Sequence, residues 1–300
     1  SKSRFNTPFA QAEFDARRMI IEGDILISRG ISKEGVNILQ KASEIAADYE
    51  LFNEYSLAND ILMSHLTYKN GVKEYEKYQI KINLFLASFQ KFIKSKDYYF
   101  KIAAPTLFNL NKEHELIAFC KRAMKELKND FETTQSSRIG YYYYYVTIFY
   151  YNMIKDYRNA FIVAQKFLNL INEKKPIQSK RNTADAYLQI GFIALQLADY
   201  KSAIKHTENA LKNFKVGLIN ELTTLEVLFL SSYYDGNWVK SHEILSRAFQ
   251  HPKLHSNDFL PAKWNYYKTC LLFKEQKFAA STIALNDCSA LLNDRTGWLY

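Results

Sequence analysis

The sequence predicts an all-α protein built from stacked helix pairs, and three observations support this fold class. The 300 residues include only nine Gly and five Pro, the residues that turns and tight loops need, so long helices joined by short polar links are expected. With 48% apolar and 24% charged residues, the chain can bury a core. A pattern of aromatic residue, short turn and paired small residues also recurs along the chain, which predicts a helical solenoid. An irregular all-helical bundle is the alternative, but bundle packing does not require this recurrence.

The clearest repeat unit spans residues 183–214. Its first helix is expected to carry Tyr187 and Gly191, and Asp199-Tyr200 marks the turn to the second helix. Gly191 has no Cβ, so the second helix can approach closely at this point. Ala203 and Ala210 are seven residues apart and therefore lie on one face of that second helix. The unit thus predicts a helix–turn–helix pair with a close crossing.

The same skeleton recurs along the rest of the chain with fewer matching positions. Pro105 falls inside the first helix of its unit, where it is expected to kink or end that helix. In chain order the units are marked by Gly23, Leu26, Gly30, Gly35 and Ala42; by the Lys69-Asn-Gly71 turn of a helix pair within residues 49–94; by Phe100, Leu107, Leu116 and Ala123; by Tyr144, Tyr151, Lys155-Asp156-Tyr157, Ala160 and Phe167; by Leu225, Leu228, Gly236-Asn237-Trp238, Ser241 and Ala248; and by Trp264, Leu272, Gln276-Lys277-Phe278, Ser281 and Cys288.

This combination of an aromatic residue, a Leu-Gly-like pair, an Asp-Tyr-like turn and two small residues resembles the tetratricopeptide (TPR) repeat. The resemblance implies a right-handed superhelix, an α-solenoid, of about seven helix–turn–helix units. The turns recur at steps of roughly 40 residues, whereas the family norm is about 34, so longer helices or longer inter-repeat loops are expected. Residues 173–176 and 251–255 are examples of such loops. The resemblance is clearest over residues 138–292 and weakest over residues 49–127.

We expect residues 1–300 to form a single TPR-like solenoid domain. The chain begins Ser-Lys-Ser and stops at Trp298-Leu-Tyr300 in mid-pattern, so it is expected to be a fragment of a longer protein. No apolar run approaches 18 residues, so no transmembrane helix is predicted. The three cysteines form no CxxC pair, which favours reduced thiols and a cytoplasmic setting.

No catalytic residue, cofactor site or metal site is predicted, and an enzyme is not expected. The chain has no phosphate-binding loop, dinucleotide fingerprint, nucleophile elbow or zinc-protease motif. His251 and His255 have a ligand-like gap, but the intervening Pro252 disfavours a helical pair, and no Cys or Asp partner is near in sequence. Cys120 and Cys288 fall at packing positions of the repeat.

The segment from Arg138 to Asn152 contains five consecutive tyrosines. Successive residues of a helix are rotated by about 100°, so the run cannot form one aromatic stripe. The TPR register assigns Tyr144 and Tyr151 to helix packing and places another stripe of the first helices on the concave surface. The residues that it predicts for a peptide groove are Tyr142, Tyr145, Phe149, Asn152, Gln189, Phe192, Tyr233, Tyr234, Lys263, Tyr266 and Lys274. The same register adds Arg17, Tyr98, Lys101, Phe108, Asn109, Glu226 and Tyr267.

An aromatic, amide-rich and cationic groove suits an extended peptide or linear motif with apolar and acidic side chains. A protein-binding scaffold is therefore the leading functional prediction. The first alternative is a sensor or regulatory domain of a larger protein, because several bacterial regulators join such repeats to an output module. The net charge of +9 and the aromatic side chains also leave single-stranded nucleic acid open. A further alternative is that the concave aromatic residues pack against one another or against a neighbouring helix.

Overall fold

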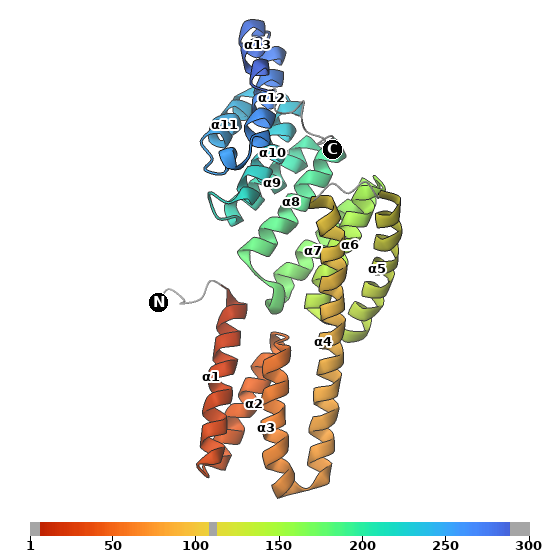
Figure 1. The fold of residues 1–300 in the computed structure, drawn as a ribbon, viewed down its shortest axis with the longest axis vertical. Coiled ribbons are helices and arrows are strands. Elements are labelled where there is room, and N and C mark those ends of the chain that lie inside the picture. Colours follow the sequence, from red (N-terminus) through yellow and green to blue (C-terminus); the bar gives the residue numbers. More distant parts are fainter. Residues whose placement is uncertain (1–6, 108–112, 289–300) are drawn as a thin grey trace. The chain divides into compact units, whose positions relative to one another are not determined.

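A computed structural model describes residues 7–107 and 113–288, and Figure 1 draws their helices in chain order. Thirteen α-helices, two short 3-10 turns and no strand occur within these residues, which confirms the all-α fold class. The helices are α1 Pro8–Ser28, α2 Ser32–Asp48, α3 Phe52–Asn70, α4 Val72–Leu107, α5 Glu113–Thr134, α6 Ser137–Met153, α7 Tyr157–Glu173, α8 Lys180–Gln196, α9 Tyr200–Asn213, α10 Ile219–Tyr234, α11 Trp238–Phe249, α12 Phe259–Lys274 and α13 Phe278–Asn286, with the 3-10 turns η1 Lys175–Ile177 and η2 Leu254–Ser256.

The chain divides into two compact units, and the boundary between them passes through α7. Unit 1 comprises Ser1–Ile154 and Lys166–Ser179, and unit 2 comprises Lys155–Gln165 and Lys180–Tyr300. The groove residues predicted on α6 therefore belong to unit 1, whereas those predicted on α8, α10 and α12 belong to unit 2.

The short turns inside the repeats share one backbone conformation. At five of them, a residue with positive φ follows the first helix, and such a residue commonly closes an α-helix. Only two of the five are glycines, so the conformation is imposed by the repeat and not only by glycine freedom. This recurrence confirms the predicted helix–turn–helix unit at these places. The φ values are 81° for Gly30, 58° for Lys155, 58° for Ala198, 77° for Gly236 and 62° for Gln276.

Helix α4 corrects the predicted division between the second and third units. The sequence pattern placed one helix pair within residues 49–94 and a new first helix near Phe100, but α4 runs without a break through both. No Gly or Pro precedes Pro105 in this helix, and Pro105 stands in its last turn, where an end was expected. The described residues thus supply seven helix pairs because α4 serves in two of them. Phe108 and Asn109 lie outside the described residues.

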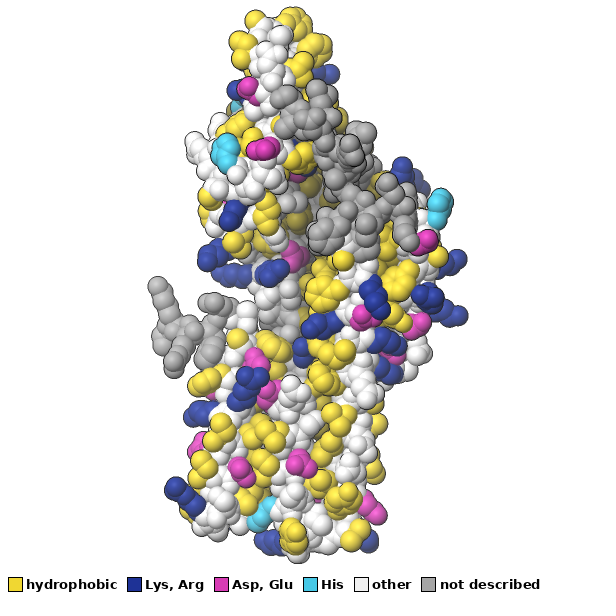
Figure 2. Space-filling view, viewed as in Figure 1, with side chains coloured by type: hydrophobic (Ala, Val, Ile, Leu, Met, Phe, Trp, Pro, Cys, Tyr) yellow, Lys and Arg dark blue, Asp and Glu magenta, His cyan; other side chains and the backbone are white. Residues whose placement is uncertain are grey.

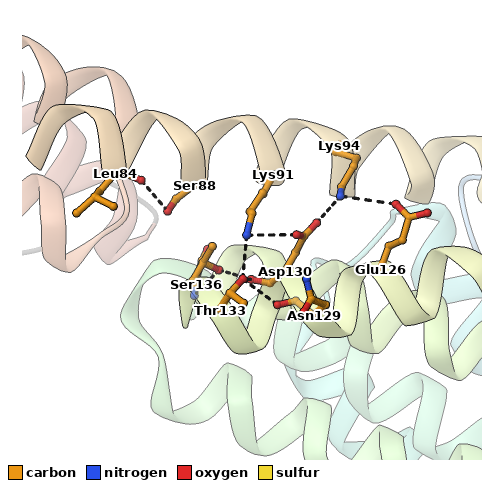
Figure 3. Close-up of polar contacts among 10 residues, drawn as sticks. Leu84, Ser88, Lys91, Lys94, Glu126, Asn129, Asp130, Thr133 and Ser136 are labelled. Atoms are coloured by element: carbon orange, nitrogen blue, oxygen red, sulfur yellow. Dashed lines mark hydrogen bonds and ion pairs between the residues drawn. The ribbon is translucent and has the colours of Figure 1, made fainter. Parts of the chain in front are cut away.

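A polar cluster, drawn in Figure 3, joins α4 to α5. Asp130 is 4% exposed, and its carboxylate oxygens lie 3.4 Å from Lys91 Nζ and 2.5 Å from Lys94 Nζ. Lys91 also donates to Thr133 Oγ1 at 2.8 Å, and Glu126 Oε2 lies 3.7 Å from Lys94 Nζ. Two ammonium groups therefore compensate a buried carboxylate whose desolvation would otherwise be costly.

Glu50 links the end of α2 to the beginning of α6. Its carboxylate accepts hydrogen bonds from Ser136 Oγ at 2.5 Å, Ser137 N at 2.7 Å and Ser137 Oγ at 2.6 Å. It also accepts from Arg138 N at 3.2 Å, while the Arg138 guanidinium donates to Glu50 O at 2.8 Å and lies 4.0 Å from the ring centroid of Phe92. Burial lowers the pKa of Arg138, and the charge of Glu50 opposes that change. The carboxylate thus satisfies amides that the first turn of α6 would leave unpaired.

The tyrosine-rich segment forms α6, and its tyrosines contact three other helices of unit 1. A helix that is apolar around its whole circumference is typical of a buried position, and α6 has this character. The run of tyrosines is therefore explained by packing on several sides at once. The ring-centroid distances are 5.4 Å for Tyr142 to Tyr99 of α4, 6.0 Å for Tyr143 to Phe131 of α5 and 5.1 Å for Tyr141 to Phe167 of α7.

Candidate functional site

In unit 1, the predicted groove residues of α6 pack against α4. Tyr142, Tyr145 and Phe149 are half-buried, and the ring centroid of Tyr145 lies 5.0 Å from that of Tyr99 on α4. Phe149 packs on a buried cluster formed by α4, α5 and α6. Asn152 is half-buried, and its Oδ1 has no hydrogen-bond partner among the described residues. Because α4 contacts this side of α6, these aromatic residues serve helix packing, which matches the self-packed alternative.

In unit 2, three tyrosines of the predicted set lie near one another on α10 and α12. Tyr234 is 58% exposed and Tyr266 is 37% exposed, and the ring centroid of Tyr233 lies 5.3 Å from that of Tyr234. The thiol of Cys270, one helical turn after Tyr266, raises the pKa of Tyr266 through its charge and its hydrogen bond. Burial and the neighbouring Tyr234 and Tyr233 raise it further. We name Tyr233, Tyr234, Tyr266 and Cys270 the tyrosine face.

Two more exposed side chains extend the tyrosine face along α12. Phe273 is 62% exposed and follows Tyr266 by seven residues, which places both on the same side of the helix. Lys274 is exposed in the last turn beside it. Lys274 was predicted, whereas Phe273 was missed although its seven-residue spacing from Tyr266 signals the shared side. The extended surface combines flat aromatic rings with one cation.

Lys263 is a correction to the predicted groove. The side chain is buried, and its Nζ lies 2.5 Å from Glu226 Oε1. The Tyr267 hydroxyl donates to the same oxygen at 2.6 Å. Burial is the main cause that raises the pKa of Tyr267, and the charge of Glu226 adds to it. The predicted cation is thus already neutralised inside unit 2, so it has no charge to offer a ligand carboxylate.

On α8, the predicted residues Gln189 and Phe192 are half-buried, and an acid lies on the same side of the helix. Asp185 precedes Gln189 by four residues, and its Oδ1 lies 3.5 Å from Asn220 Nδ2. Burial raises the pKa of Asp185 to about 6, although Arg181 and Asn220 act in the opposite direction. Sequence reasoning missed this residue, for which the four-residue spacing was the available signal. A carboxyl group that titrates near neutral pH beside a candidate surface is a feature of functional sites.

The raised pKa of Asp185 predicts a pH-dependent gain in stability on replacement by Asn. Protonated Asp185 favours the folded state below pH 4, and this contribution is lost as pH rises through about 6. Asp185→Asn mimics the protonated form, so we expect it to raise the free energy of unfolding by about 1–2 kcal/mol at pH 7.5 and to change it little at pH 4. Urea unfolding at both pH values tests this. An equal destabilisation at both pH values would mean that Asn220 and Arg181 stabilise the ionised form.

Two of the three thiols lie in the interior of the protein. Cys120 and Cys288 are buried, as predicted for packing positions, and burial raises the pKa of Cys120 to about 12. In residues 7–107 and 113–288, no group of three or more His, Cys, Asp or Glu side chains is arranged to bind a metal ion. No helix in the same ranges is long and apolar enough to cross a membrane.

At least two surface cavities lie within the described residues of unit 1. One, of about 420 Å³, lies between α3 and α4, where Leu57 and Leu86 remain 52% and 40% exposed. Figure 2 shows hydrophobic side chains over these two helices. The other cavity, of about 440 Å³, has both charged and aromatic lining residues, including Glu50, Tyr55 and Lys81. The sequence analysis predicted neither cavity, and the second depends on segments that are far apart in the sequence.

The comparisons with known proteins show the fold. No protein-family model matches the chain, and no curated protein matches it in sequence. One similar solved structure is a Signal Transduction ATPase with Numerous Domains (STAND) protein with a tetratricopeptide repeat sensor, from Pyrococcus horikoshii. The TM-score is 0.52 at 19% identity over 86% of this chain. The chain spans about two-fifths of that protein, since 41% of it is covered. The all-α, TPR-like helical-repeat fold predicted from the sequence is thereby confirmed.

Proposed function

We propose that this chain is a protein-binding module with a sensor role, and that it binds an extended peptide segment of a partner on the tyrosine face of unit 2. The observation that supports the proposal is the exposure of Tyr234 and Tyr266 on the first helices α10 and α12. Large aromatic rings that remain exposed beside one another are characteristic of binding hot spots. The sensor role is supported by the fold likeness to the STAND protein, whose repeats are described as a sensor.

The chemistry of the face favours a peptide with apolar or aromatic side chains and at least one acid. Tyr234, Tyr266 and Phe273 offer ring surfaces for stacking, and Lys274 at the end of α12 offers a charge for a carboxylate. Lys263 beneath the face is paired with Glu226 and holds α12 to α10. The recognition we propose therefore depends more on aromatic contact than on several ion pairs, so the affinity is expected to depend weakly on salt.

The proposal is tested in two steps. A peptide is first selected from a phage-displayed library of random dodecapeptides, and its affinity for the protein is then measured by fluorescence anisotropy. We expect the double variant Tyr234→Ser, Tyr266→Ser to lower the affinity for the selected peptide at least about tenfold, because aromatic hot-spot residues carry most of the binding free energy. Helicity and the unfolding midpoint should change little, since both rings are exposed. Tyr68→Ser is the matched control, because Tyr68 is 95% exposed and lies in unit 1.

Unchanged peptide affinity in the double variant would refute the tyrosine face as the binding surface. Oligonucleotides serve as the second arm of the same assay. Binding of a single-stranded oligonucleotide whose affinity falls steeply between 50 and 200 mM salt would instead favour the nucleic-acid function.

A further inference from the structure

The charged and aromatic cavity of unit 1 lies where several helices and turns meet. It is lined by residues from the end of α2, the α2–α3 turn, α3, α4, the α5–α6 turn with the adjoining helix ends, and the segment at η1, and its volume is about 440 Å³. Pockets of roughly 300–1,000 Å³ are of the size that holds small molecules. All of its lining residues belong to unit 1, so the cavity is independent of the tyrosine face.

Stacked aromatic rings contribute to the lining of this cavity. The ring centroids of Tyr55 on α3 and Phe85 on α4 lie 3.9 Å apart with an interplanar angle of 24°. Phe52 lies 5.2 Å from Phe85 and also lines the cavity. Phe52 is buried behind this pair, so the half-buried rings of Tyr55 and Phe85 present the flat apolar surface, which favours a flat aromatic body over a polar one.

Some charged side chains of the cavity already have hydrogen-bonding partners, whereas others are available to a ligand. The carboxylate of Glu50 already accepts four hydrogen bonds from residues 136–138, so it is not available to a ligand. Lys81 and Lys174 are exposed on the lining, and neither forms an ion pair with another described residue, although Lys81 Nζ lies 5.4 Å from the ring centroid of Tyr78. Asp48 is the remaining acid of the lining and is also exposed. Two available cations against one acid favour a ligand with a single negative charge.

We propose that this cavity binds a small molecule that has a flat aromatic body and one carboxylate. The aromatic body would stack on Tyr55 and Phe85, and the carboxylate would pair with Lys81 and Lys174. Asp48 would repel a second negative charge on the ligand, and it would also moderately weaken the binding of a ligand with a single carboxylate. The site does not rest on the peptide function proposed for unit 2, and the loss of either leaves the other intact.

The probe that tests this site is N-acetyl-L-phenylalanine, and its carboxamide is the matched neutral control. Ligand-observed NMR titration should give saturable binding of the carboxylate with a Kd on the order of 1 mM, as expected for a ligand of this size. The carboxamide should bind at least about fivefold more weakly, because it lacks the charge.

Charge variants assign the binding to this cavity. Lys81→Gln should weaken the binding of N-acetyl-L-phenylalanine about three- to tenfold. Asp48→Asn should instead tighten its binding about two- to threefold. Lys73→Gln, an exposed lysine on α4 outside the lining, should have no effect. Ala47→Trp should abolish binding by filling the cavity, because Ala47 is an exposed residue of its lining. Circular dichroism checks that each variant is folded.

The opposite signs expected for Lys81→Gln and Asp48→Asn separate a charge effect from a loss of structure. The proposal is overturned by equal binding of the acid and its carboxamide, or by equal effects of Lys81→Gln and Lys73→Gln. The proposal is also overturned if no saturable binding is seen up to about 10 mM. A Kd above that concentration would be much weaker than the value expected for a matched site.

Discussion

Glu50→Ala is expected to lower the free energy of unfolding by about 2–3 kcal/mol, because the half-buried carboxylate accepts four hydrogen bonds from residues 136–138. The substitution would remove the largest of the charges that compensate the burial of the Arg138 guanidinium. It would also remove the acceptor of the hydrogen bonds from Ser136 and Ser137 at the beginning of α6. Urea unfolding followed by far-UV circular dichroism measures the effect.

Glu44→Ala is the matched control for Glu50→Ala, because Glu44 is an exposed glutamate on α2, the helix that precedes Glu50. We expect it to change the unfolding free energy by less than about 0.5 kcal/mol. A loss at Glu50 no larger than the loss at Glu44 would contradict the role of this carboxylate. Arg138→Lys is a second test of this network, because Lys keeps the positive charge but loses the contact of the planar guanidinium with the Phe92 ring.

Gly191→Ala is expected to destabilise unit 2 by about 2–3 kcal/mol, even though Ala favours helices over Gly. A Cβ at this position of α8 would lie 2.6 Å from Thr207 Oγ1 of α9. Thr207 is fully buried and its hydroxyl donates to Ala203 O, so it cannot move away without losing that bond. Tryptophan fluorescence reports this unit, because Trp238 and Trp264 both lie within it.

A double-mutant cycle isolates the close crossing of α8 and α9. In a Thr207→Ala background the nearest remaining atom to the added Cβ is Thr207 N at 3.3 Å, which is a much milder contact. We therefore expect Gly191→Ala to cost at least about 1 kcal/mol less in that background. Equal costs in the two backgrounds would show that the helices do not approach at this point as described.

The features that sequence reasoning predicted correctly are those governed by local rules. The turns at Gly30 and Gly236 need positive φ, and residues such as Ala203 and Ala210 repeat at helical spacing, so both are visible in the sequence. Gly191 was predicted to allow a close crossing, and this is confirmed because a Cβ added there would lie only 2.6 Å from Thr207 Oγ1. These signals are sufficient to predict the TPR-like repeats without knowledge of distant contacts.

The features that sequence reasoning missed depend on contacts between distant residues. The aromatic face of α6 is covered because α4 continues past the expected break, which the pattern around Phe100 did not indicate. Lys263 has the spacing of a groove residue, but whether it is exposed depends on Glu226, 37 residues earlier in the sequence. Asp185 and Phe273 share helix sides with predicted residues, so a stricter use of four- and seven-residue spacing would have included them.

The rate of Cys270 alkylation tests the proposed peptide surface most directly, because Cys270 lies within the tyrosine face. Burial raises the pKa of this thiol, so the reaction is best followed by mass spectrometry near pH 9. The buried Cys120 serves as an internal reference in the same chain. We expect a saturating amount of a selected peptide to slow alkylation of Cys270 at least about fivefold while leaving the Cys120 rate unchanged. An unchanged Cys270 rate with the peptide fully bound would contradict the proposal that peptides bind on the tyrosine face.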